Sequence, residues 1–99
     1  DEIVSTEGVD LALIGPADLA RAYGVTSEKD PPAVKAAVDT IAAAARKAGK
    51  PIGLSIFHAA FNRGYRELFD LGVRFITQSS DAAMLERGMR ESLKTARES

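Results

Sequence analysis

Cysteine is absent from the 99 residues, which excludes disulfides, thiolate metal sites and a cysteine nucleophile. Because this absence fits a reducing compartment, we expect a cytoplasmic location. The sequence also lacks an excess of either charge, with a net charge of −1, whereas a nucleic-acid binder would carry a basic surplus. No apolar run approaches the roughly 20 residues that a membrane span needs. We therefore expect neither nucleic acid nor a membrane as a partner.

The chain does contain a regular alternation of strand-like and helix-like segments. Apolar or β-branched runs predict strands at residues 9–14, 51–57 and 73–78. The first run shows no polar alternation, which is typical of a parallel strand buried on both faces. The first eight residues resemble the tail of a helix, and residues 18–24 predict a short helical turn.

Three longer helices follow from spacing and from stop signals. The first has Asp30 as its N-cap and Pro31 at its first position, and Gly49 ends it. The second spans residues 59–71, with Arg63 on its solvated face. Ser79, Ser80 or Asp81 caps the third, which we expect to fray from residue 94 on. The expected apolar faces are Val34, Ala37, Val38, Ile41, Ala44, Ala45 and Ala48 in the first helix, and Leu85, Met89 and Leu93 in the third.

The order of these elements indicates an α/β fold, either doubly wound or a closed barrel. A closed (β/α)8 barrel needs eight strand–helix units and about 250 residues, and three units alone would leave apolar strand edges open. The chain also opens at Asp1 without a methionine. We therefore expect residues 1–99 to form one partial domain, the C-terminal three βα units of a TIM (β/α)8 barrel, with the N-terminal units upstream.

The strongest candidate site is the segment Gly15-Pro16-Ala17-Asp18, directly after the first strand. Ligands of α/β sheets and barrels bind at the carboxyl ends of the strands. Gly15 lets the backbone approach a ligand, Pro16 stiffens the turn, and the carboxylate of Asp18 suits a hard divalent cation. Spacing alone gives equal weight to a second interpretation, in which Asp18 caps the short helix that follows.

Other candidate residues lie at or just after the ends of strands. Ser55 and Phe57, near the end of the second strand, are candidates for lining a substrate pocket. His58, the only histidine, comes after the second strand, and a loop or capping role is favoured over a catalytic one. Gln78 either contacts the substrate or bonds to the backbone.

The run of residues 8–19, Gly-Val-Asp-Leu-Ala-Leu-Ile-Gly-Pro-Ala-Asp-Leu, is similar to the signature segment of the HpcH/HpaI aldolase family. These are the 4-hydroxy-2-oxoheptanedioate and 2-keto-3-deoxy-sugar-acid aldolases. The resemblance continues through residues 48–53 and 72–76 to Asp81, so it extends over essentially the whole chain. The Gly-Pro-Ala-Asp-Leu part is its most specific element.

The resemblance implies a metal-dependent class II aldolase. Such an enzyme reversibly cleaves a 4-hydroxy-2-oxo acid to pyruvate and an aldehyde through a metal-stabilised enolate. In the family a Glu and an Asp hold the divalent cation (Mg²⁺, Mn²⁺ or Co²⁺), and Asp18 matches the Asp. The backbone at Ala17 matches the contact to the pyruvate carboxylate, so the substrate-binding segment is residues 15–18. The resemblance also implies a homo-oligomer, with a hexamer as one form, in which the last helix packs on a neighbour.

The remaining catalytic groups of the family are expected upstream of Asp1, namely the Glu ligand, an Arg and a His/Asp acid–base pair. Glu7 does not replace the Glu ligand, because it precedes the first strand and belongs at the opposite end of the barrel. Two alternatives stay open. One is a sibling enzyme, either a citrate-lyase-β-like lyase or an oxaloacetate decarboxylase. The other is a catalytically incomplete barrel fragment that packs on partner chains.

Overall fold

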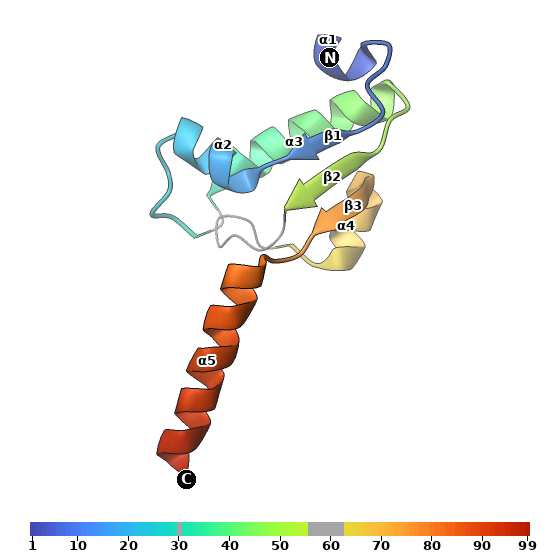
Figure 1. Ribbon diagram of the computed structural model, residues 1–99. Helices are drawn as coiled ribbons and strands as arrows, with labels where there is room; N and C mark the ends of the chain where they lie inside the picture. The colour runs from blue at the N-terminus through green and yellow to red at the C-terminus, as the bar shows by residue number, and fades with distance from the viewer. Residues whose placement is uncertain (30, 56–62) are drawn as a thin grey trace.

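The structure is a computed structural model that describes residues 1–29, 31–55 and 63–99 (Figure 1). Its elements, in chain order, are α1 (Glu2–Ser5), β1 (Ala12–Ile14), α2 (Pro16–Ala22), α3 (Pro32–Lys47), β2 (Ile52–Ser55), α4 (Tyr65–Leu71), β3 (Val73–Thr77) and α5 (Asp81–Glu98). Strands and helices alternate as the sequence predicts.

The three strands form a parallel sheet in the order β1-β2-β3. Ile14 pairs with Leu54, Leu54 pairs with Ile76, and the register shifts between Ile52 and Gly53, which pair with Val73 and Phe75. Sequential parallel strands joined by helices are the repeating unit of a (β/α) barrel. The predicted fold class, three βα units of such a barrel, is confirmed.

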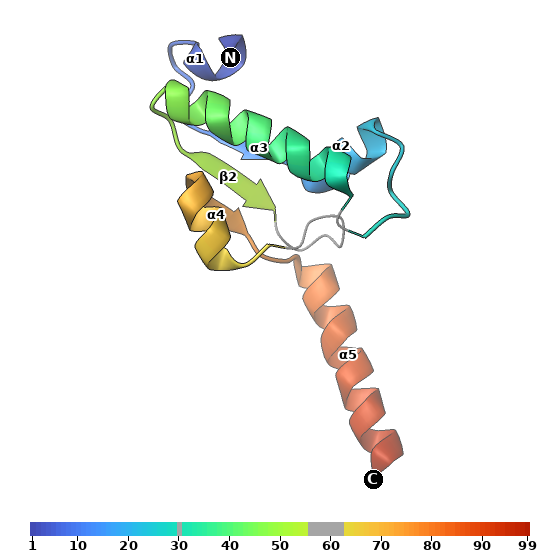
Figure 2. The same ribbon diagram turned by 180° about the vertical axis from the view of Figure 1, so that it is seen from behind.

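Helices α3 and α4 cover one face of the sheet, lying behind it in Figure 1 and in front of it in Figure 2. One side of α3 is buried, as its spacing predicts. The core between the helices and the sheet is made of Ile14, Ala20, Val34, Val38, Ala42, Ala45, Ile52, Leu54, Leu68 and Val73. The opposite face of the sheet is bare, since Leu13 and Phe75 are 58% and 51% exposed. In a barrel, the helix-covered face is the outside and the bare face is the inside.

Several predicted boundaries are wrong at the amino ends of elements. β1 begins at Ala12 rather than residue 9. The short helix begins at Pro16, two residues earlier than expected. Pro31 is the N-cap of α3, and Pro32 takes the first helical position. A residue before proline avoids helical backbone, and Pro31 has the extended ψ of 135° that this restriction favours. The expected N-cap, Asp30, lies outside the described residues.

Of the helix predicted for residues 59–71, residues 59–62 lie outside the described residues, and α4 begins at Tyr65 with Gly64 as its N-cap. Glycine inside a helix costs up to about 1 kcal/mol relative to alanine, which favours the later start. The predicted stop at Gly72 is confirmed by its left-handed φ of 103°. Phe57 and His58 lie outside the described residues, so their suggested roles stay predictions.

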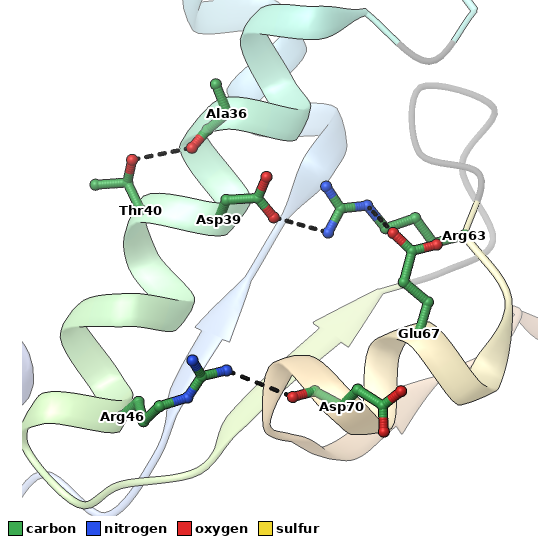
Figure 3. A network of polar contacts seen from close by, with 7 residues as sticks. All are labelled: Ala36, Asp39, Thr40, Arg46, Arg63, Glu67 and Asp70. Atoms are coloured by element: carbon green, nitrogen blue, oxygen red, sulfur yellow. Dashed lines mark hydrogen bonds and ion pairs between the residues drawn. The ribbon is translucent and has the colours of Figure 1, made fainter.

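The prediction that Arg63 lies on a solvated face is wrong, because its side chain is only 3% exposed. Its guanidinium binds Asp39 of α3 at 2.9 Å and Glu67 of α4 at 3.3 Å (Figure 3). Arg46 of α3 also donates to the backbone oxygen of Asp70 at 3.4 Å. A buried charge is tolerated only where partners compensate its desolvation, so this network fixes α3 and α4 side by side over the sheet.

Helix α5 extends away from the sheet, as both views show (Figures 1 and 2). The predicted cap is confirmed, since Ser80 Oγ accepts from the amide of Ala83 at 3.1 Å. The expected fraying is wrong, because the helix continues to Glu98 with ion pairs between Glu86 and Arg90 and between Lys94 and Glu98. Such i, i+4 pairs each stabilise a helix by about 0.2–0.5 kcal/mol. No residue of α5 is buried.

Candidate functional site

The candidate segment forms the turn from β1 into α2. Gly15 is the N-cap and keeps an extended backbone, with φ −104° and ψ 96°. Pro16 follows at the first helical position and is buried, where its missing N–H leaves no helical bond unmade. Asp18 is therefore the third residue of the helix, and the alternative interpretation of Asp18 as the N-cap is wrong.

The carboxylate of Asp18 folds back over Gly15. A Cβ added to Gly15 would lie 2.9 Å from Oδ2 of Asp18. The other oxygen, Oδ1, accepts from Arg21 at 3.3 Å, and both side chains are largely exposed. An exposed ion pair contributes at most about 1 kcal/mol, so Arg21 does not prevent the carboxylate from taking another partner.

The carboxylate lies on the bare inner face of the sheet. A Cβ added to Gly53 would meet the side chains of Leu13 and Phe75, at 2.9 and 3.2 Å, which shows that these residues share one face. In extended backbone, residues two apart point to the same side. A Cβ on Gly15 would therefore point to the same face of the sheet as Leu13. The carboxylate of Asp18 occupies that space. A carboxylate at the carboxyl ends of the strands and inside the barrel wall has the position of a barrel active site.

Two hydroxyl groups lie at the carboxyl ends of the other two strands. Ser55 and Thr77 pair in register at the ends of β2 and β3, and Thr77 Oγ1 donates to Ser55 Oγ at 2.7 Å. The sequence indicated Ser55 as a pocket residue but not Thr77. The missed signal is that Thr77 follows Phe75 by two residues and so shares its face. Gln78 and Ser79 follow β3, and Ser79 is not the helix cap, because Ser80 takes that role.

Glu7 lies at the opposite end of the strands. The backbone oxygen of its neighbour Thr6 accepts from Lys50 Nζ at 2.8 Å, and Lys50 precedes β2. This placement agrees with its rejection as a second metal ligand. Within residues 1–29, 31–55 and 63–99, no three His, Cys, Asp or Glu side chains converge to hold a metal. One exposed carboxylate with hard oxygen donors fits a divalent cation as a single ligand of a larger set.

The helices bear on whether the chain could cross a membrane. Of the helices in the described parts of the chain, none combines the length and apolar character that crossing a membrane requires. The expected cytoplasmic location stays a prediction.

The fold is a segment of a (β/α) barrel, and it places the Asp18 carboxylate at the carboxyl ends of the strands. The family model for HpcH/HpaI aldolase/citrate lyase matches residues 1–86. The chain belongs to this family.

Named relatives are similar over nearly all of this chain. A hydroxypyruvate/pyruvate aldolase of Agrobacterium fabrum is 37% identical over 90 residues, covering 91% of this chain and 33% of that protein. A 4-hydroxy-2-oxo-heptane-1,7-dioate aldolase of Salmonella arizonae is 35% identical over 86 residues, covering 87% of this chain and 32% of that protein. The chain thus spans about a third of the length of the curated relatives it matches.

Solved structures agree with the fold. An HpcH/HpaI aldolase/citrate lyase family protein from Burkholderia cenocepacia superposes with a TM-score of 0.80 at 35% identity, over 96% of this chain and 36% of that one. A citrate synthase variant superposes with a TM-score of 0.78 at 22% identity, over 98% of this chain and 42% of that one. The second likeness shows the fold alone.

Proposed function

We propose that this chain supplies the carboxyl-terminal part of a metal-dependent aldolase. The enzyme reversibly cleaves a 4-hydroxy-2-oxo acid to pyruvate and an aldehyde. The observation that carries the proposal is the carboxylate of Asp18, held over Gly15 on the inner face of the sheet at the carboxyl ends of the strands. The aldolase names of the relatives support the reaction class.

Each residue of the segment has a physical role in this proposal. Asp18 offers hard oxygen donors to Mg²⁺, Mn²⁺ or Co²⁺. When bound, the cation supplies Lewis acidity that stabilises the negative charge of an enolate. The amide of Ala17 lies in the first helical turn, where backbone N–H groups lack helical acceptors, and it contacts the carboxylate of pyruvate. Gly15 leaves the space that the Asp18 carboxylate occupies.

The inner face below the site is apolar. Leu13 and Phe75 meet across Gly53, one layer nearer the amino ends of the strands. This floor keeps water from the underside of a bound ligand. A second carboxylate ligand and an acid–base pair would come from the other units of the barrel. Because the named relatives are aldolases, we do not propose the citrate-lyase-like or decarboxylase alternative.

Solvent deuterium exchange into the methyl group of pyruvate tests the proposal directly, because enolate formation releases a methyl proton. We expect NMR to show exchange by the longest natural polypeptide that carries these residues when Mn²⁺ or Mg²⁺ is present. EDTA should abolish the exchange, and added metal should restore it. A folded, metal-loaded protein that exchanges no deuterium would contradict the assignment to pyruvate.

Substitution of Gly15 by alanine should weaken Mn²⁺ binding about tenfold or more, with little loss of folding stability. The added methyl would approach Asp18 Oδ2 to 2.9 Å, so the carboxylate must rotate away. Displacing groups that orient a metal ligand typically costs about 10–100-fold in affinity. Calorimetric titration with Mn²⁺ measures the effect, and thermal unfolding reports stability.

The matched control is Gly64→Ala. Gly64 is also a helix N-cap with extended backbone, but an added Cβ there meets nothing within 4 Å among the residues that the structure describes. Both variants therefore share any capping cost, and their difference isolates the contact with Asp18. Equal Mn²⁺ affinity in the two variants would show that the position of this carboxylate does not matter for the metal.

We also propose that the protein is a homo-oligomer, with a hexamer as the form that the family resemblance implies. In this assembly α5 packs against a neighbouring chain. Leu85, Met89 and Leu93 recur at intervals of four along one side of α5, and they are 65%, 65% and 51% exposed. A neighbouring subunit would remove this apolar stripe from water.

A further inference from the structure

The hydroxyl pair of Ser55 and Thr77 lies on the inner face of the sheet, directly above an apolar layer. Both side chains are half-buried, and they are joined by a hydrogen bond of 2.7 Å. The layer beneath them consists of Leu13, Gly53 and Phe75. The two hydroxyl groups at the barrel mouth can form hydrogen bonds with a ligand, whereas the apolar layer below them cannot.

The pair lies next to the Asp18 carboxylate. Ile14 pairs with Leu54, and the next residues along the chain are Gly15, just beyond the end of β1, and Ser55, the last residue of β2. Adjacent strands lie about 4.8 Å apart. Since the carboxylate of Asp18 folds over Gly15, a small molecule held at Asp18 is within reach of the Ser55 hydroxyl.

The hydrogen-bonding capacity of the pair is specific. A hydroxyl donates once and accepts twice. Thr77 donates its hydrogen to Ser55, which leaves Thr77 with acceptor capacity only. The hydrogen of Ser55 has no acceptor among the described residues. The pair therefore offers one donor with acceptor positions beside it, which complements a hydroxyl group of a ligand. An alkyl group in the same place would leave the Ser55 donor unpaired.

We propose that the Ser55–Thr77 pair is a specificity determinant that selects substrates carrying a hydroxyl group. This inference rests on the proposed aldolase function. The hydroxyl belongs either to the aldehyde or to the 2-oxo acid. Both sources present the same chemistry to the pair, and matched substrates separate them.

The test compares kcat/KM for two substrate pairs in the longest natural polypeptide that carries these residues. Glycolaldehyde and acetaldehyde, each with pyruvate, differ only by a hydroxyl on the aldehyde. Hydroxypyruvate and pyruvate, each with the same aldehyde, differ only by a hydroxyl on the oxo acid. Ser55→Ala and the near-isosteric Thr77→Val should each reduce the preference for one hydroxylated substrate by about three- to tenfold, the range of one neutral hydrogen bond.

Additional variants distinguish recognition of a substrate hydroxyl from a structural role in which the Ser55–Thr77 hydrogen bond only links β2 to β3. Thr77→Ser keeps the hydroxyl and should restore the preference. The double variant should lose little more than either single one, because the pair acts as a unit. Thr40→Val removes a hydroxyl that bonds to Ala36 on the helix-covered side, and it should leave all ratios unchanged. A loss of activity that is equal for hydroxylated and unsubstituted substrates would assign the pair a structural role only and overturn the inference.

Deuterium exchange into pyruvate distinguishes this inference from the function on which it rests. Exchange by the wild-type protein reports the proposed function by itself, and the control Thr40→Val should match its rate. Normal wild-type exchange, with substrate ratios that Ser55→Ala and Thr77→Val leave unchanged, overturns the inference alone. A folded, metal-loaded wild-type protein without exchange overturns the proposed function, and the inference with it.

Discussion

Asp18→Asn is expected to lower metal-dependent deuterium exchange into pyruvate by about 100-fold or more. Asparagine preserves the shape of the side chain and its place in the first turn of α2, but it replaces a charged donor with a neutral amide. Hard divalent cations strongly prefer carboxylate oxygen. Removing one preorganised donor that stabilises developing negative charge typically costs about 10²–10³-fold in rate, and a cation held by Asp18 supplies stabilisation of this kind.

The exchange rate of the Asp18 variant should be measured over a series of Mn²⁺ concentrations, alongside Asp10→Asn as a control. Asp10 is an exposed aspartate just before β1, at the amino ends of the strands, so its replacement changes charge equally without touching the site. The control should behave as the wild type. Asp18→Asn with wild-type exchange and wild-type affinity for Mn²⁺ would remove Asp18 from the metal site.

The sequence predicted the order of the elements because the signals for them are local. The apolar face of α3 follows from spacing, and Gly49 and Gly72 end helices through left-handed backbone that other residues rarely adopt. The position of Asp18 relative to the strand also follows from chain order, since four residues beyond Ile14 must lie near the carboxyl end of β1. These predictions required no knowledge of distant contacts.

Other features depended on contacts that a single sequence does not display. Arginine is usually solvated, but the guanidinium of Arg63 is buried between Asp39 and Glu67. Asp39 is 24 positions away in the chain. The spatial role of Gly15 arises because the Asp18 carboxylate folds back over it. Thr77 became a site candidate only through its register with Ser55. In each case the deciding partner lies on another turn or element.

The early start of α2 and the late start of α4 reflect competition between local preferences. Pro16 suits the first helical position better than the expected start at Asp18, because its ring already has helical φ and its missing N–H would have no acceptor there. Gly64 is more stable as a cap than inside a helix. Boundary residues thus follow propensity, whereas the helix interiors follow the apolar pattern.

The double variant Leu85→Ser/Met89→Ser should convert the proposed oligomer to smaller species. The two side chains are 65% exposed in the single chain, so their replacement should not destabilise its core. Burying one such side chain in an interface contributes about 1.5–3 kcal/mol, so two lost per subunit should weaken association by more than about 100-fold. Light scattering after gel filtration measures the mass of the assembly, and circular dichroism reports whether α5 remains helical.

Arg87→Ser provides the control, because Arg87 follows Leu85 by two positions and therefore lies on the opposite side of α5. It changes the same helix without touching the apolar stripe, and it should leave the mass unchanged. A wild-type protein that is monomeric at micromolar concentration would contradict the proposed oligomer. An assembly that withstands loss of both apolar side chains would show that another surface holds the subunits together. Dissociation that leaves metal-dependent exchange intact would further separate the two sites, since Asp18 lies on the inner face of the sheet and α5 extends away from it.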